Sequence, residues 1–195
     1  TLSVITNWTD RSTCVLFGDA AGAFVVEAGP EEGPGLIDTA VYSDGSTWQH
    51  LYIPAGGSKK PLTPELLAAR QDRLIMNGRE VYKIAVRSLV DAARKILEKN
   101  GLTANDIDLV VAHQANLRII EAVAKRAGIS MDRCYVNIQR YGNMSSATVP
   151  VALVEALEDG RVAPGCNLLL TGFGAGLSWS AHMLRWGERT TPLGA

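Results

Sequence analysis

The chain twice repeats the order of apolar strand, polar turn and apolar helix. The first polar turn, residues 113–118, reads His-Gln-Ala-Asn-Leu-Arg, and the second, residues 141–147, reads Tyr-Gly-Asn-Met-Ser-Ser-Ala. In an open α/β sheet, ligands bind in the crevice at the carboxyl ends of the strands. The pattern therefore predicts an α/β fold in which His113 and Asn143 occupy equivalent positions, each at a strand end and before a helix.

The composition excludes several classes of protein. The 195 residues are 47% hydrophobic and 20% charged, and 19 basic residues against 20 acidic ones give a net charge of −1. Because the charges form no long runs of one sign, we expect neither a nucleic-acid partner nor binding to an anionic membrane. The apolar runs are too short to span a bilayer, and no leader peptide opens the chain. We therefore expect a cytoplasmic protein.

Three cysteines are widely spaced, each among apolar neighbours: Cys14, Cys134 and Cys166. This arrangement is typical of reduced core thiols rather than of disulfides or zinc ligands. His50 and His182 also lack partners at the spacing of a metal site, so the sequence predicts no bound metal.

The hydrophobic periodicity predicts alternating strands and helices. We expect strands at residues 14–17, 23–28, 36–42, 107–112, 134–138, 167–171 and 178–186, and helices at residues 80–100, 117–127 and 146–158. Asn100-Gly101 and Gly128 are predicted to end two of the helices, and Pro150 to bend the third. Residues 43–64 form an unusually long irregular segment, and such segments often line a site.

A glycine-rich loop, residues 172–176, reads Gly-Phe-Gly-Ala-Gly. A dinucleotide-binding loop has to open a helix, but residues 178–186 alternate as a strand does, so we exclude nucleotide redox chemistry. A tight turn between strands can aim a backbone amide at a developing oxyanion, which contributes about 3 kcal/mol to its stabilisation. A plain hairpin explains the spacing equally well, and both interpretations stay open.

The motifs around His113, Asn143 and Gly174, in that order, resemble those of β-ketoacyl-acyl carrier protein synthase III. The resemblance extends to residues 9–11 (Thr-Asp-Arg), 17–22 (Phe-Gly-Asp-Ala-Ala-Gly) and 76–86. It implies a thiolase-like α/β fold, in which two similar halves pack into five layers of the αβαβα type. Residues 1–35 would be the end of the first half, with its last strands, and residues 36–195 the whole second half.

The family's catalytic set is a cysteine, a histidine and an asparagine, and the resemblance assigns the latter two to His113 and Asn143. In the family the cysteine lies upstream of the Thr-Asp-Arg segment, and Cys14 does not match it. We therefore expect the nucleophile to come from a separate N-terminal half, and this chain alone to be inactive in condensation.

The same resemblance implies residues that bind coenzyme A or its pantetheine arm. Arg11 would meet the adenine end, Met76, Gly78 and Tyr82 would line the pantetheine tunnel, and Asn116 would orient water and ligand groups near the catalytic pair. Coenzyme A thioesters are substrates in this family, so no resident cofactor is expected.

Further implied contacts concern the carrier protein and the glycine loop. Arg118 resembles a basic residue that docks the acidic acyl carrier protein. Gly174 and Ala175 would form the oxyanion loop; Ala175 stands where many relatives have glycine, but a backbone amide there keeps its role. The complete enzyme would be a homodimer that uses acyl-CoA and malonyl-carrier protein.

The reaction implied by the resemblance is a decarboxylative Claisen condensation that starts fatty acid synthesis. Loss of carbon dioxide gives an enolate-like thioester, and His113 Nε2 and Asn143 Nδ2 are expected to donate to its oxygen. A helix amino terminus beside His113 would keep its ring neutral. The alternatives are a non-catalytic thiolase-like module that binds coenzyme A or carrier protein, and half of a related polyketide-type synthase. A histidine and an asparagine at matching positions favour the enzyme.

Overall fold

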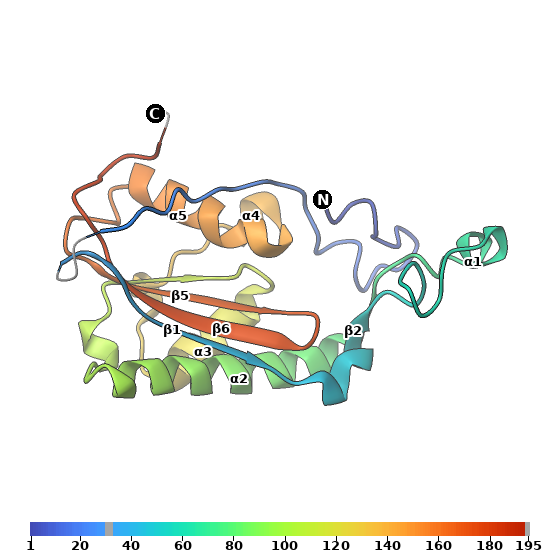
Figure 1. The fold of residues 1–195 in the computed structure, drawn as a ribbon, viewed down its shortest axis with the longest axis horizontal. Coiled ribbons are helices and arrows are strands. Elements are labelled where there is room, and N and C mark those ends of the chain that lie inside the picture. The colour runs from blue at the N-terminus through green and yellow to red at the C-terminus, as the bar shows by residue number, and fades with distance from the viewer. Residues whose placement is uncertain (30–32, 194–195) are drawn as a thin grey trace.

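The chain forms a three-layered α/β/α unit around one mixed sheet (Figure 1). The computed structural model describes residues 1–29 and 33–193. The sheet has the strand order β1-β6-β5-β4, with α2 and α3 on one face and α4 and α5 on the other. Its strands are β1 (Gly35–Ser43), β4 (Leu109–Ala112), β5 (Asn167–Gly174) and β6 (Ser178–Arg185).

Parallel and antiparallel pairing are combined in this sheet. β4 runs parallel to β5, whereas β6 is antiparallel to both β5 and β1. All four residues of β4 are buried, as expected for a parallel strand that helices cover on both faces. The predicted strands at 36–42, 107–112, 167–171 and 178–186 are thereby confirmed, although β4 begins two residues later than predicted.

Helix α2 (Gly78–Lys99) is the longest element and buries one apolar face against the sheet. Asn77 caps its start by accepting a hydrogen bond from the N–H of Glu80, and Gly101 follows its end with a φ of +66°. Glycine has no Cβ that would clash in this left-handed conformation, so the predicted end of the helix is confirmed.

Helix α3 (Leu117–Ala127) ends at Gly128, which has a φ of +75° and is the predicted cap. α5 (Thr148–Glu158) follows a 3-10 turn, η4 (Ser145–Ala147), and begins two residues later than predicted. Pro150 lies in the first turn of α5, where a missing N–H breaks no helical hydrogen bond. The proline therefore fits the start of the helix.

Three strand predictions were wrong. Residues 14–17 lie in turns, apart from one bridge between Phe17 and Asn143. Residues 134–138 keep a single bridge, from Cys134 to Val110, before the short helix α4 (Ile138–Tyr141) begins. Residues 23–28 pair with no strand of the described chain and are exposed. Apolar, β-branched residues favour strands, but only where a partner strand is beside them.

The predicted irregular segment contains short elements and projects from one end of the sheet (Figure 1). It includes a 3-10 helix, η1 (Gly45–His50), and the short strand β2 (Leu51–Tyr52). It is continued by α1 (Pro64–Ala68) and β3 (Ile75–Met76). The remaining 3-10 turns are η2 (Ala104–Asp106) and η3 (Met131–Arg133). A hydrogen bond of 2.9 Å from Leu74 N to Ile5 O connects this projection to residues 1–29, the amino-terminal segment.

The predicted boundary between the end of a first half, residues 1–35, and a second half, residues 36–195, stays a prediction. Residues 30–32, which are close to this boundary in the sequence, lie outside the described residues. β1 starts at Gly35 and belongs to the main sheet. In the described ranges, no helix is both long and apolar enough to cross a membrane.

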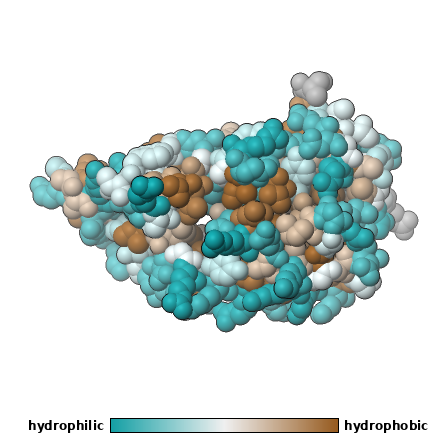
Figure 2. Space-filling model, turned by 180° about the vertical axis from the view of Figure 1, so that it is seen from behind, coloured by the Kyte–Doolittle hydropathy of each residue, from teal (hydrophilic) through white to brown (hydrophobic). Residues whose placement is uncertain are grey.

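Hydrophobic side chains gather on the surface as well as in the core. One face of the molecule shows hydrophobic areas close together among polar ones (Figure 2). The most exposed large apolar residues include Val15, Val25 and Val26, all in the amino-terminal segment, and Val26 is 90% exposed. Isolated exposed apolar residues are normal, but a gathered set marks a surface that other protein can cover.

Candidate active site at the ends of β4 and α4

His113 lies directly after β4 and shortly before α3, as the sequence predicts. Its backbone N–H donates to Thr171 O at 2.7 Å, which extends the pairing of β4 with β5 by one residue. The ring Nδ1 lies 2.5 Å from Oγ1 of Thr148, the first residue of α5. The imidazole is thus held between a strand end and a helix start.

Burial keeps His113 neutral. Desolvation lowers its pKa from 6.5 to about 4, although the Ser145 carbonyl nearby acts weakly in the other direction. The residue as a whole is only partly buried. The expected neutral imidazole is supported, and burial rather than the neighbouring helix is the main cause.

Asn143 follows the short helix α4 instead of a strand, which corrects the predicted symmetry with His113. Its backbone N–H donates to Leu16 O at 2.7 Å, and its carbonyl accepts from Gly18 N at 2.9 Å. The preceding residue, Gly142, has a φ of +69° and lies against Leu16 O, where no side chain fits. The amino-terminal segment therefore fixes the main chain of Asn143.

In the described part of the chain, one hydrogen bond orients the Asn143 side chain. Its Oδ1 accepts from Ser145 N at 2.9 Å, and among the described residues Nδ2 has no hydrogen-bond partner. Ser145 has a φ of +57°, an unusual conformation for a residue other than glycine, and such residues cluster at functional sites. The Ser145 carbonyl accepts from Thr148 Oγ1, the partner of His113, at 2.8 Å. Ser145 is thus hydrogen-bonded directly to Asn143 and, through Thr148, to His113.

Gln114 links the two loops below the surface. It is fully buried, and its Nε2 donates to Ala112 O at 2.8 Å and to Tyr135 O at 3.1 Å. Its Oε1 accepts from Asn137 N at 3.2 Å. Because these bonds connect the His113 loop to the residues before α4, they fix the positions of the two loops relative to each other.

Glu155 on α5 continues this network. Its buried carboxylate accepts from Asn137 Nδ2 at 2.8 Å and from the Tyr141 hydroxyl, and it pairs with Arg140 at 2.9 Å. Three donors compensate for the loss of water around the charge. Sequence reasoning missed Glu155, since an acidic residue in an amphipathic helix gives no sign of burial.

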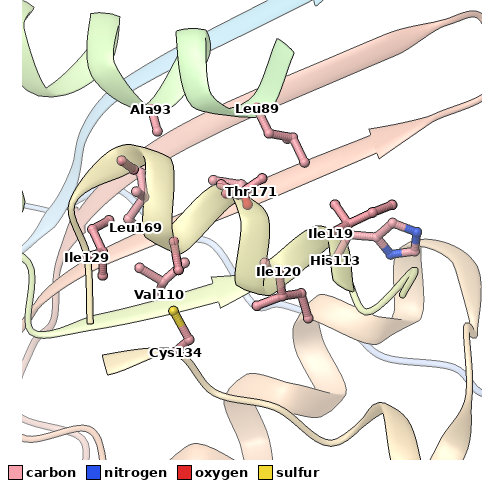
Figure 3. Close-up of a pocket in the computed structure, with 14 residues that line it drawn as sticks. Leu89, Ala93, Val110, His113, Ile119, Ile120, Ile129, Cys134, Leu169 and Thr171 are labelled. Atoms are coloured by element: carbon pink, nitrogen blue, oxygen red, sulfur yellow. The ribbon is translucent and has the colours of Figure 1, made fainter. Parts of the chain in front are cut away.

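Two hollows lie near these loops. The enclosed one has room for about 20 Å³ and is lined almost wholly by apolar side chains of α2, α3, β4 and β5 (Figure 3). The His113 ring stands at its edge and points away from it, and this volume holds about one water molecule. The second is an open groove of about 270 Å³ between residues 21–22 and α5. Neither hollow is lined by both His113 and Asn143.

The residues expected to bind coenzyme A fall in two places. Met76 ends β3 and Gly78 begins α2, close enough for the Met76 side chain to border Gly78, and Tyr82 is exposed on the first turns of that helix. Arg11 is exposed in the amino-terminal segment. Asn116 has a structural role, because its side chain caps α3 by accepting from Arg118 N at 2.9 Å.

Of the other predicted residues, Arg118 and Ala175 are exposed and Gly174 is partly buried. Arg118 is exposed on the first turn of α3. Gly174 ends β5 and Ala175 begins the tight turn into β6, so the hairpin interpretation describes this loop. An oxyanion role for its amides stays a prediction. Among the described residues, no group of three histidine, cysteine or acidic side chains could hold a metal ion.

Known proteins share both the sequence and the fold. The family described as 3-oxoacyl-[acyl-carrier-protein (ACP)] synthase III matches residues 1–45, and its C-terminal part matches residues 97–186. The chain belongs to this synthase III family. The β-ketoacyl-[acyl-carrier-protein] synthase III of Symbiobacterium thermophilum is 51% identical over 187 residues, which are 96% of this chain and 56% of that protein.

Solved structures agree. Synthase III from Pseudomonas aeruginosa PAO1 has a TM-score of 0.86 and 38% identity, covering 96% of this chain and 56% of that one. The priming β-ketosynthase of the R1128 polyketide pathway has a TM-score of 0.80 and 31% identity, covering 96% and 55%. The predicted thiolase-like fold is confirmed. The chain spans about half the length of the relatives it matches.

Gly18 tests how the amino-terminal segment supports Asn143. A Cβ at Gly18 would collide with the Tyr141 carbonyl oxygen, whereas a Cβ at Gly29 meets nothing within 4 Å. Gly18→Ala should lower the free energy of unfolding by about 1–3 kcal/mol and shift the amide NMR signal of Asn143. Gly29→Ala is the matched control and should do neither. An unchanged Asn143 signal in Gly18→Ala would show that this contact does not fix the turn.

Glu155→Ala tests the buried network. The change leaves the Asn137 and Tyr141 donors without their acceptor, so urea unfolding should show a loss of about 3 kcal/mol. Glu158 lies on the exposed side of the same helix, and Glu158→Ala should change stability by no more than about 0.5 kcal/mol. Equal effects of the two substitutions would contradict a structural role for Glu155.

The lowered pKa of His113 predicts how stability depends on pH. Because the folded protein binds the His113 proton less tightly than the unfolded chain, stability should be complete above about pH 6.5 and fall toward pH 4. The slope in this window is at most about 1.4 kcal/mol per pH unit, and His113→Gln should remove this component. An NMR titration of the His113 ring with a midpoint near 6.5 would contradict the burial effect.

Proposed function

We propose that this chain supplies the histidine and asparagine of a synthase III that condenses an acyl-CoA primer with malonyl-carrier protein to start fatty acid synthesis. The observation that carries the proposal is the shared support of His113 and Asn143 by Ser145. The arrangement combines a neutral imidazole with an amide N–H that no contact in the described structure occupies.

The chemistry needs such a pair. When the malonyl group loses carbon dioxide, the electrons of the breaking C–C bond form an enolate whose charge rests on the thioester oxygen. Preorganised donors at that oxygen stabilise the transition state, and one such donor is typically worth a factor of about 100–1,000 in rate. The enolate carbon then attacks the acyl group on a cysteine and releases the thiolate. Asn143 Nδ2, which has no hydrogen-bond partner among the described residues, would act as one donor.

The nucleophilic cysteine is proposed to come from a separate N-terminal segment. Cys134 does not fit the role, since burial raises its pKa to about 11, whereas an attacking cysteine needs thiolate character. Cys14 lies in a turn of the amino-terminal segment and does not match the family's cysteine position.

The remaining binding residues are proposals on the same footing. The coenzyme A thioester would be contacted by Arg11, Met76, Gly78, Tyr82 and Asn116. It acts as a substrate, so no resident cofactor is proposed. Arg118 is exposed, as a residue that docks an acidic carrier protein has to be. We further propose that the complete enzyme is a cytoplasmic homodimer.

A polyketide-type priming synthase is the second candidate function. The structural similarity to the R1128 priming β-ketosynthase supports it, but at lower sequence identity than the synthases III of bacterial origin reported above. An assay in which different acyl-CoA primers compete would distinguish the two candidate functions, because the two kinds of synthase differ in the acyl group that starts the chain. No specific observation favours a non-catalytic module.

The test compares the proposed complete enzyme, in which an N-terminal segment that carries the cysteine is joined to this chain, with the 195 residues alone. The complete enzyme should condense acetyl-CoA with malonyl-carrier protein, and His113→Ala or Asn143→Ala should each reduce kcat by about 100-fold or more. Glu158→Ala is the control and should retain full activity. The 195 residues alone should give no product. Turnover by that chain would refute the need for a separate cysteine, and full activity of either site variant would refute the assigned pair.

A further inference from the structure

Thr148 occupies a position between the two loops that the mechanism above does not use. It is fully buried and is the first residue of α5. Its Oγ1 has two polar neighbours, Ser145 O at 2.8 Å and His113 Nδ1 at 2.5 Å. The first distance is typical of an O–H···O hydrogen bond, and the second is short for a contact between nitrogen and oxygen. Each contact therefore needs a hydrogen between its two heavy atoms.

Counting hydrogens decides the direction of these bonds. A threonine hydroxyl carries one hydrogen and a carbonyl oxygen carries none, so the hydrogen between Thr148 and Ser145 O comes from Thr148. Oγ1 then presents only lone pairs to His113 Nδ1, and the hydrogen in that contact belongs to Nδ1. The opposite orientation would bring two oxygen lone pairs together at 2.8 Å in a buried place, which is unfavourable.

We propose that Thr148 is a positioning residue that fixes His113 as the tautomer protonated at Nδ1, which leaves Nε2 as a hydrogen-bond acceptor. A neutral imidazole carries one hydrogen on its two nitrogens, so protonation of Nδ1 leaves Nε2 bare. The lowered pKa of His113 is consistent with a neutral ring. The Ser145 carbonyl, which also accepts from the backbone N–H of Thr148, completes the chain of bonds.

The tautomer changes the order of events at the site. Nε2 can receive a proton from a neighbouring thiol or water, but it cannot donate to a thioester oxygen until it has done so. The expectation that Nε2 donates therefore holds only after such a proton has arrived, and Asn143 Nδ2 is the donor in the resting state. This consequence for catalysis rests on the proposed function, but the tautomer itself does not.

Nitrogen-15 NMR of the 195-residue chain tests the proposal. Long-range proton–nitrogen spectra at neutral pH distinguish a protonated ring nitrogen from a bare one, and His113→Asn assigns the signals among the three histidines. The wild type should show a protonated Nδ1 and a bare Nε2. A protonated Nε2 in the wild type overturns the proposal, whatever the variants do.

Two substitutions isolate the hydroxyl. Thr148→Ser keeps it and should preserve the wild-type tautomer, whereas Thr148→Val keeps the shape and should make the Nε2-protonated form detectable. The ring signals of His182, which lies in β6, are the internal control and should not change. If Thr148→Val leaves the His113 tautomer as in the wild type, Thr148 does not set it. If that variant fails to fold, Thr148→Ala takes its place under the same criterion.

This experiment fails independently of the proposed function. Its readout is a nitrogen chemical shift in the 195-residue chain and needs neither substrate nor a cysteine segment. An inactive complete enzyme would refute the proposed function and leave the tautomer standing, and a wrong tautomer would leave the assigned pair intact.

Discussion

The site depends on the conformation of one residue, Ser145. Its backbone N–H holds the Asn143 side chain, and its carbonyl holds Thr148 next to His113. A left-handed conformation at a residue other than glycine is costly, so it persists only where the surrounding bonds enforce it. Here the donors to Glu155 and the bonds of Gln114 hold the flanking chain, so the rigidity of the core reaches the reactive groups.

Local signals in the sequence were sufficient for the main helices and the central strands. The caps at Asn100-Gly101 and Gly128 act within a few residues, and the apolar run before His113 has no competing interpretation. The position of His113 after β4 followed from this pattern alone. The family was inferred from the residue identities in the sequence motifs, which are more specific to one family than hydrophobic periodicity is.

Non-local pairing was where sequence reasoning failed. Residues 23–28 have the composition of a strand, but composition names no partner, and the described chain offers none beside them. Residues 134–138 look like a strand because they are apolar, although only Cys134 and Tyr135 contact Val110 before α4 begins. The roles of Thr148, Glu155 and Gln114 were likewise hidden, since a polar residue in an apolar run does not reveal which distant atom it will meet.

The bridge between Phe17 and Asn143 means that different parts of the structure support the two reactive groups. His113 is built into the sheet through Thr171, whereas the main chain of Asn143 leans on residues 16–18, which belong to a segment without regular structure. Proteolytic cleavage within residues 1–29 would therefore remove the support of the Asn143 main chain while the imidazole kept its place. Vulnerability of this kind would appear as a protein that still folds but has lost one half of its reactive pair.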